Sequence, residues 1–127
     1  MTPRWVPAPA VIVIHDRQIA RHGGAPGIRD RTLLEGGLAR PLNRFGFGET
    51  DLHVLAANYA FGIAKAHAFV DGNKRTAFVT AVTFLGLNEA RFSAPAIEIV
   101  RNMEDLASDD LSEDGFGAWL KGKFEVC

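Results

Sequence analysis

The sequence contains one cysteine, Cys127, at its last position, so an intramolecular disulfide is excluded. A lone cysteine fits a reducing compartment, and we expect the protein to be cytoplasmic. No apolar run reaches the roughly 18 residues of a membrane span, so no membrane partner is expected. The apolar run from Val11 to Ile14 is short and is followed directly by His15, which is unlike a signal peptide.

The chain also lacks an excess of charge of one sign. Its formal net charge is −1, which argues against bulk electrostatic binding to nucleic acid, so no direct nucleic-acid partner is expected. Acidic residues gather late in the chain, without an intervening Lys or Arg: Glu104, Asp105, Asp109, Asp110, Glu113 and Asp114. We interpret this stretch as a solvated turn between two helices, and a docking patch for a basic partner is the second interpretation.

Length and periodicity predict the fold class. At 127 residues and 47% hydrophobic, the chain can form one core and is too short for two domains, so we expect a single domain over residues 1–127. Residues 1–9, which hold three prolines, are expected to be an extended or mobile arm. Hydrophobic spacing predicts an all-α fold, a compact bundle of about six helices near residues 9–22, 30–40, 51–67, 73–89, 95–107 and 112–124.

Glycines weaken the second predicted helix. Gly36 and Gly37 are adjacent, and two glycines inside a helix cost roughly 2 kcal/mol relative to alanine. We therefore expect this helix to be short, split or closely packed against a neighbour. After it, residues 41–48 begin with Pro41 and hold Gly46 and Gly48 around Phe47, which predicts a mobile loop.

The most informative stretch runs from His67 to Arg75 and has the sequence His-Ala-Phe-Val-Asp-Gly-Asn-Lys-Arg. Apolar segments with helical spacing flank it on both sides. We therefore expect a polar loop at the junction of two central buried helices. Polar groups placed there are costly to desolvate unless they are paired or take part in chemistry.

The order of residues in this loop indicates an anion site. Gly72 lets the backbone approach a ligand closely, and the N–H groups of Asn73, Lys74 and Arg75 open the following helix at its positive dipole end. Two cations at a helix N-terminus oppose the dipole, so their presence needs an anion to explain it. A solvated first turn is the alternative interpretation of the two cations.

Two further side chains suit chemistry on a bound phosphate. Asp71 is the only carboxylate between Asp51 and Glu89, and Mg²⁺ in nucleotide sites usually takes one or two carboxylates with phosphate oxygens and water. Histidine is the side chain whose ordinary pKa suits a general base near neutral pH, which assigns that role to His67. Taken alone, residues 71–73 also fit a simple turn, and His67 also fits a structural histidine.

A zinc-hydrolase site is a weaker interpretation. His67 and Asp71 are spaced i, i+4, but Gly72 and Asn73 indicate that the helix ends before them. No further histidine or cysteine lies close enough in sequence to complete a zinc site. The other histidines are expected to be structural: His15, His22 and His53.

The loop resembles the Fic/Doc family signature, His-x-Phe-x-Asp/Glu-Gly/Ala-Asn-x-Arg, and is most similar to its Doc (death-on-curing) toxin branch. Lys74 stands where Fic adenylyltransferases usually have glycine and Doc proteins have lysine. Phe78 stands where Fic enzymes have an arginine. The stretch from Ile14 to Gly27 is similar to the opening of Doc, and the resemblance covers residues 10–92.

The resemblance implies a toxin kinase that transfers the γ-phosphate of ATP to a threonine of elongation factor Tu and so blocks translation. It implies ATP and Mg²⁺ as cofactors, with His67 as the base and Asp71 as the metal ligand. Lys74, in place of glycine, would disfavour the pose for AMP transfer. The implied site residues are catalytic His67, Asp71, Lys74 and Arg75, and nucleotide-binding Gly72, Asn73, Lys74 and Arg75.

The resemblance also implies partners. Such toxins are held by a small antitoxin of the Phd type, whose disordered tail folds into a groove beside the active site. In Fic-like folds the region corresponding to residues 41–48 helps to dock the target, which makes it a candidate substrate flap. Two alternatives stay open: a Fic-type adenylyltransferase that transfers AMP to a hydroxyl side chain, and a non-catalytic member that binds only nucleotide or antitoxin.

Overall fold

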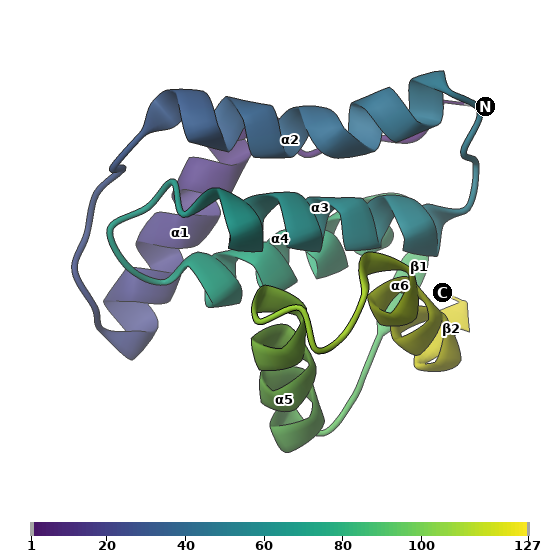
Figure 1. Cartoon of the computed structure of the whole chain (residues 1–127). Helices are drawn as coiled ribbons and strands as arrows, with labels where there is room; N and C mark the ends of the chain where they lie inside the picture. The colour runs from purple at the N-terminus through teal and green to yellow at the C-terminus, as the bar shows by residue number, and fades with distance from the viewer. Residues whose placement is uncertain (1, 127) are drawn as a thin grey trace.

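The computed structural model describes residues 2–126, and this part of the chain is mostly helical (Figure 1). Its elements are α1 (Ala8–His22), α2 (Arg31–Gly46), α3 (Leu52–Ala66), α4 (Asn73–Leu87), β1 (Ala90–Phe92), α5 (Ala96–Ala107), α6 (Glu113–Gly122) and β2 (Phe124–Val126). The all-α prediction is confirmed, with one addition: β1 and β2 form a short antiparallel pair where the last predicted helix ends. Within residues 2–126, no helix is long and apolar enough to cross a membrane. Cys127 lies outside the described residues.

Helix α3 is the centre of the bundle. It packs against α2, α4 and α6, and ten of its 15 residues are buried. In Figure 1, α2 runs along one side of α3, α4 lies behind it and α6 lies below. Small residues such as Ala56, Ala57 and Ala60 let these neighbours approach from several directions. Because α3 is buried nearly all round, its last residue delivers the following polar loop at one edge of the molecule.

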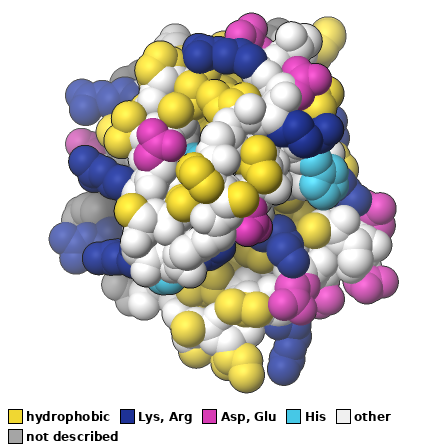
Figure 2. All heavy atoms as spheres, turned by 90° about the vertical axis from the view of Figure 1, so that its left-hand side faces the viewer, with side chains coloured by type: hydrophobic (Ala, Val, Ile, Leu, Met, Phe, Trp, Pro, Cys, Tyr) yellow, Lys and Arg dark blue, Asp and Glu magenta, His cyan; other side chains and the backbone are white. Residues whose placement is uncertain are grey.

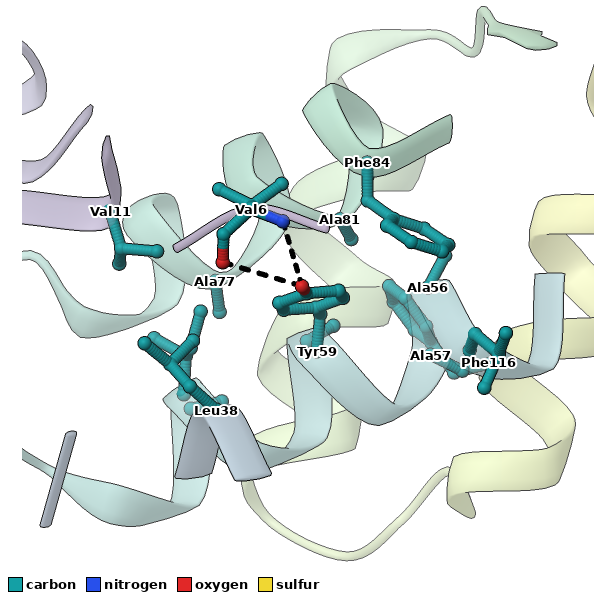
Figure 3. Packing of buried hydrophobic residues seen from close by; sticks show 14 of the residues in the cluster. Val6, Val11, Leu38, Ala56, Ala57, Tyr59, Ala77, Ala81, Phe84 and Phe116 are labelled. Atoms are coloured by element: carbon teal, nitrogen blue, oxygen red, sulfur yellow. Dashed lines mark hydrogen bonds between the residues drawn. The ribbon is translucent and has the colours of Figure 1, made fainter. Parts of the chain in front are cut away.

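The N-terminal arm carries no helix or strand over residues 2–6, and it is anchored to the core. The Val6 N–H donates to the Tyr59 hydroxyl over 2.9 Å, and that hydroxyl donates back to the Val6 carbonyl over 3.3 Å (Figure 3). The Trp5 ring stacks on Phe84, with the centroids 5.7 Å apart, and meets Phe45 edge-on. These contacts cover the end of the core beyond the start of α1.

Polar contacts join the start of α6 and the turn before it to α2 and α3. Glu113 accepts hydrogen bonds from Arg40 of α2, 2.8 Å from Nε, and from Asn58 of α3, 2.6 Å from Nδ2. Burial raises the pKa of Glu113, but these hydrogen bonds outweigh burial and hold its pKa below the usual value. Asp109 pairs with Lys65 at 2.7 Å. Two acids of the 104–114 stretch are therefore bound within the molecule.

The closest approach between α2 and α3 lies at two glycines. A Cβ built on Gly37 would lie 2.6 Å from the carbonyl oxygen of Gly62 and 3.5 Å from the Cβ of Ala66. Real Cβ atoms essentially never come so close to a backbone atom. Of the three expectations for residues 36 and 37, close packing against a neighbour is confirmed, and α2 is neither short nor split.

The predicted mobile loop at residues 41–48 is wrong for residues 41–46, and residues 47 and 48 form a turn. Helix α2 continues through Pro41 to Gly46, and Pro41 is buried on the same face as Leu34 and Leu38. The three residues follow a helical stripe, so burial of their apolar surface outweighs the lost N–H of Pro41. Most of the candidate substrate flap is therefore helix within α2, which packs on α3, and its role in docking a target stays a prediction.

We expect Gly37→Ala to destabilise the fold by about 2 kcal/mol, because its methyl group meets the Gly62 backbone, which has no flexible side chain to move aside. Gly36→Ala is the matched control. It adds the same group one residue earlier, where nothing lies within 4 Å, and should stabilise the helix by about 0.5–1 kcal/mol. Urea unfolding followed by circular dichroism measures both. Equal midpoints for the two variants would contradict the close contact.

Candidate active site

The loop between α3 and α4 reverses the chain through two left-handed residues. His67 ends α3 with φ 50° and ψ 41°, and Gly72 begins α4 with φ 75° and ψ 19°. A left-handed conformation is natural for glycine and is strained for a histidine, so other contacts must hold His67 in place. The predicted junction of two buried helices lies at this position.

Within the loop, Asn73 and Phe69 fix the backbone. Asn73 Oδ1 accepts from the Phe69 N–H over 3.1 Å, and its Nδ2 donates to the Phe69 carbonyl over 3.0 Å. The Phe69 side chain is 1% exposed, so it anchors the loop in the core. The side-chain amide of Asn73 thus binds the backbone of the loop. The group of Asn73 that is available to an anion is its backbone N–H.

A segment from the α1–α2 connection pairs with this loop. We call residues 23–30 the clamp segment. Ile28 and Phe69 form an isolated antiparallel bridge, and the Val70 N–H donates to the Gly27 carbonyl over 3.1 Å. The Ala68 carbonyl accepts from two successive clamp N–H groups at 2.7 and 3.0 Å. The clamp segment therefore satisfies the polar backbone that the loop exposes.

Arg29 of the clamp segment holds the residue that is predicted to be the base. Its Nε and Nη2 donate to the His67 carbonyl over 2.9 and 2.5 Å. This carbonyl lies at the C-terminal end of α3, where the helix dipole favours a cation. The contact fixes the backbone of His67 in its left-handed conformation. Sequence reasoning missed Arg29, because nothing in its own neighbourhood indicates a partner 38 residues away.

The Asp71 carboxylate is held by the loop and by the clamp segment. Asp71 Oδ1 accepts from the Gly72 N–H of the loop over 2.8 Å, and Asp71 Oδ2 accepts from the Ala25 N–H of the clamp segment over 3.4 Å. A Cβ built on Gly24, which has φ 115°, would lie 2.7 Å from Asp71 Oδ2. Only glycine leaves room for the carboxylate here. The paired glycines at 23 and 24, followed by Gly27, were the signal in the sequence for this close approach.

The predicted site residues surround one cavity of about 340 Å³. Its lining includes His67, Asp71, Gly72, Asn73, Lys74 and Arg75, together with Ala64, Val70 and Ala107. Among residues 2–126, no hydrogen bond or ion pair engages the imidazole of His67 or the ammonium group of Lys74. Arg75 donates to the Gly23 carbonyl over 3.3 Å. A base, a carboxylate and two cations thus meet in one hollow.

The start of α4 supplies further positive charge to this cavity. The first helical bond in α4 runs from the Thr76 N–H to the Gly72 carbonyl, and no side chain caps the helix. The N–H groups of residues 73–75 precede that bond, and such groups with the helix dipole form an anion site. Figure 2 looks at the edge of the molecule where the clamp segment and the α3–α4 loop lie, and it shows cationic and His side chains reaching the surface there among hydrophobic ones.

Asp71 fits a Mg²⁺ that also depends on phosphate oxygens. Each of its carboxylate oxygens accepts one backbone N–H and keeps further lone pairs, and the side chain is exposed to the cavity. Across the described residues, no group of three or more His, Cys, Asp or Glu side chains forms a complete metal site. The arrangement therefore suits a metal that arrives with a nucleotide, as Mg²⁺ does.

A second cavity, of about 420 Å³, adjoins the first. We call it the apolar groove. Its hydrophobic lining comes from α4 and α5: Phe78, Val79, Ile99, Val100 and Met103. The polar and charged residues of its lining are Gln18, Arg21, His22, Lys74, Arg75 and Glu104. Lys74 and Arg75 line both cavities. An occupant of the groove would lie against the cations of the first cavity.

We expect Gly24→Ala to weaken Mg²⁺-dependent ATP binding by about 10- to 100-fold, because its methyl group displaces the Asp71 carboxylate. Gly23→Ala is the matched control: its φ of 81° gives comparable backbone strain, yet nothing lies within 4 Å of its Cβ. Titration calorimetry of ATP, with and without Mg²⁺, measures the difference. Equal affinity in the two variants would show that strain alone, and not the carboxylate, governs binding.

Comparison with known proteins agrees with this geometry. A model of the Fic/DOC family matches residues 5–85. The chain is 36% identical over 96 residues to "Protein kinase doc" of Escherichia phage P1, across 74% of this chain and 76% of that protein. It is 36% identical over 105 residues to "Toxin Doc" of Mycolicibacterium smegmatis, across 79% of this chain and 80% of that one. Because the matched residues include both the clamp segment and the whole loop from His67 to Arg75, the chain belongs to the Fic/DOC family.

Proposed function

We propose that this protein is a Doc-like toxin kinase, a single domain that acts in the cytoplasm and transfers the γ-phosphate of ATP to a threonine of elongation factor Tu. One observation carries the proposal most directly. The imidazole of His67, which has no partner among residues 2–126, shares a single cavity with the Asp71 carboxylate and the cationic start of α4. The names of the two Doc relatives, one a kinase and one a toxin, support the same activity for this chain.

In this proposal His67 is the general base. Its imidazole takes the proton from the attacking threonine hydroxyl, whose oxygen forms a bond to the γ-phosphorus. The bond from that phosphorus to the bridging oxygen breaks, and ADP leaves with the electron pair. General bases contribute about 10² to 10⁴ in rate as a class. Arg29 supports this step by fixing the His67 backbone, so the imidazole stays at the mouth of the cavity.

The other site residues hold the phosphates. The backbone N–H groups of residues 73–75, and the side chains of Lys74 and Arg75, surround the anion at the start of α4. Phosphoryl transfer depends mostly on positioning and charge stabilisation, so these groups matter as much as the base. Mg²⁺ held by Asp71 would neutralise charge on the phosphates.

Lys74 distinguishes the proposed reaction from AMP transfer. Lys74 lines both the cavity and the apolar groove, at a position where glycine would leave space. A positive charge beside the transferring phosphate, together with the volume that the side chain fills, disfavours the pose in which the α-phosphate faces the hydroxyl. An adenylyltransferase stays the alternative function, and the test below separates the two.

We expect purified elongation factor Tu to gain one phosphate on a threonine when it is incubated with this protein, ATP and Mg²⁺. ATP labelled at the γ position should transfer its label, and ATP labelled at the α position should not. Intact-mass and peptide mass spectrometry measure the product, with His67→Ala as the inactive control. A gain of AMP would move the protein to the adenylyltransferase class, and an unmodified substrate would exclude elongation factor Tu as the target.

The apolar groove fits the proposed antitoxin. Its floor is hydrophobic and its rim is mostly cationic, which suits an amphipathic segment that folds on binding and carries acidic residues. A segment lying there would cover Lys74 and Arg75, which belong to the phosphate site as well. We therefore propose that a small antitoxin of the Phd type binds in this groove and blocks the nucleotide cavity by covering Lys74 and Arg75.

We expect Val100→Glu to abolish rescue by the antitoxin, because it puts a charge into the hydrophobic floor of the groove. Val100 is 55% exposed, so the substitution leaves the core intact. Ile97→Glu is the matched control on the same helix: Ile97 is 72% exposed and lies outside the groove. Growth of cells that co-express each variant with the antitoxin is the measurement. If both variants are rescued equally, the antitoxin does not bind there.

A further inference from the structure

His15 lies directly beneath the active-site loop and has no part in the chemistry described above. It belongs to α1, is 1% exposed, and is one of only two buried residues of that helix, the other being Val11. A buried imidazole without a hydrogen-bond partner would destabilise the fold by about 1–3 kcal/mol, so the ring nitrogens of His15 require partners. Hydrophobic residues would fill the same space without that requirement.

The His15 ring makes two contacts with the loop. Its Nε2 lies 2.8 Å from the backbone carbonyl oxygen of Asp71. A carbonyl oxygen only accepts hydrogen bonds, so Nε2 carries a proton and donates it. The ring also stacks on Phe69, with centroids 3.9 Å apart and planes 9° from parallel. His15 therefore supports the loop at two points on either side of Val70.

The hydrogen bond fixes the orientation of one peptide group. In a trans peptide the C=O and the following N–H point in opposite directions. With the Asp71 carbonyl held toward His15, the Gly72 N–H points to the other side, where Asp71 Oδ1 accepts it over 2.8 Å. The rotation of this peptide therefore sets the direction of the Gly72 N–H just before α4, and through that N–H it sets the position of the Asp71 carboxylate.

Gly72 has no side chain that could hold this conformation. It is in the left-handed region with φ 75°, and it begins α4 without a side-chain cap. A Cβ at Gly72 would lie 3.2 Å from the Ile19 side chain, which is a tight contact, and 3.7 Å from the His15 ring, which is an ordinary one, so the left-handed φ is the main reason that this position favours glycine. The backbone at this residue is the most flexible in the loop by residue type, and the His15 bond restrains it.

We propose that His15 is a positioning residue of the active site, whose Nε2–H orients the Asp71–Gly72 peptide and through it the carboxylate of Asp71 and the anion-binding start of α4. The proposal rests on the proposed function only where it concerns the rate of phosphate transfer. The orientation of the peptide and the binding of Mg²⁺ with ATP can be tested without that reaction.

The first test uses the wild-type protein and nitrogen-15 NMR. The His15 ring should be in the form that is protonated at Nε2, with a slowly exchanging ring N–H, and the Gly72 amide should exchange slowly as well. A ring protonated only at Nδ1, or a freely exchanging Gly72 amide, would overturn the proposal whether or not the protein is a kinase.

The second test compares two substitutions that separate the donor from the ring. His15→Gln keeps an N–H near the position of Nε2 and loses the stack on Phe69, whereas His15→Phe keeps a stacked ring and loses the donor. We expect kcat and Mg²⁺-dependent ATP binding to fall about 10- to 100-fold in His15→Phe, with KM for the protein substrate little changed. His15→Gln should recover most of both, although its melting temperature is the lower of the two.

A purely structural role predicts the reverse order, with the activity of each variant following its melting temperature. That result would overturn the proposal. If the wild-type protein transfers no phosphate, the same comparison is made on ATP binding and on Gly72 amide exchange. His15→Phe should then show the faster exchange, and equal exchange in the two variants would exclude the positioning role.

Discussion

Backbone pairing between the clamp segment and the α3–α4 loop is the interaction on which the site depends. A buried helix that ends in polar residues leaves carbonyl and N–H groups without helical partners, and these must be satisfied elsewhere. The bridge between Ile28 and Phe69, with the bonds to Ala68 and Val70, does this. Once the backbone is satisfied in this way, no hydrogen bond or ion pair within residues 2–126 engages the side chains of His67 and Lys74, and both line the cavity where a ligand would bind.

The position and chemistry of the site could be predicted from the sequence because they depend on short-range patterns. Helical spacing on both sides of residues 67–75 places a loop between buried helices, and Gly72 followed by an amide and two cations indicates an anion site. The structure places these residues around one cavity. The local pattern could not indicate which hydrogen bonds hold each of these residues in place. Asn73 has a side chain suited to a phosphate, yet it binds the Phe69 backbone.

Contacts across long sequence separations explain what the sequence did not indicate. Arg29 and His67 are 38 residues apart, and His15 and Asp71 are 56 apart. Neither pair has a periodicity or motif that joins its members. The error at residues 41–48 has another cause: proline and glycine are typical of loops, but burial of Pro41 beside Leu38 favours continued helix. Tertiary packing, and not local propensity, determines that residues 41–46 are helical.

The glycine contact between α2 and α3 also acts as a spacer for the active site. Helix α2 starts where the clamp segment ends, and α3 ends where the loop begins, so the two helices carry the two halves of the site at the same edge of the molecule (Figure 1). Gly37 lies about 9 Å along α2 from its first residue, and its contact reaches Ala66, the last residue of α3. The absence of two side chains thus sets the width of the gap that the hydrogen bonds at residues 27–30 must bridge. A methyl group on Gly37 would push α2 away from α3 and so move the two halves of the candidate site apart without touching either of them.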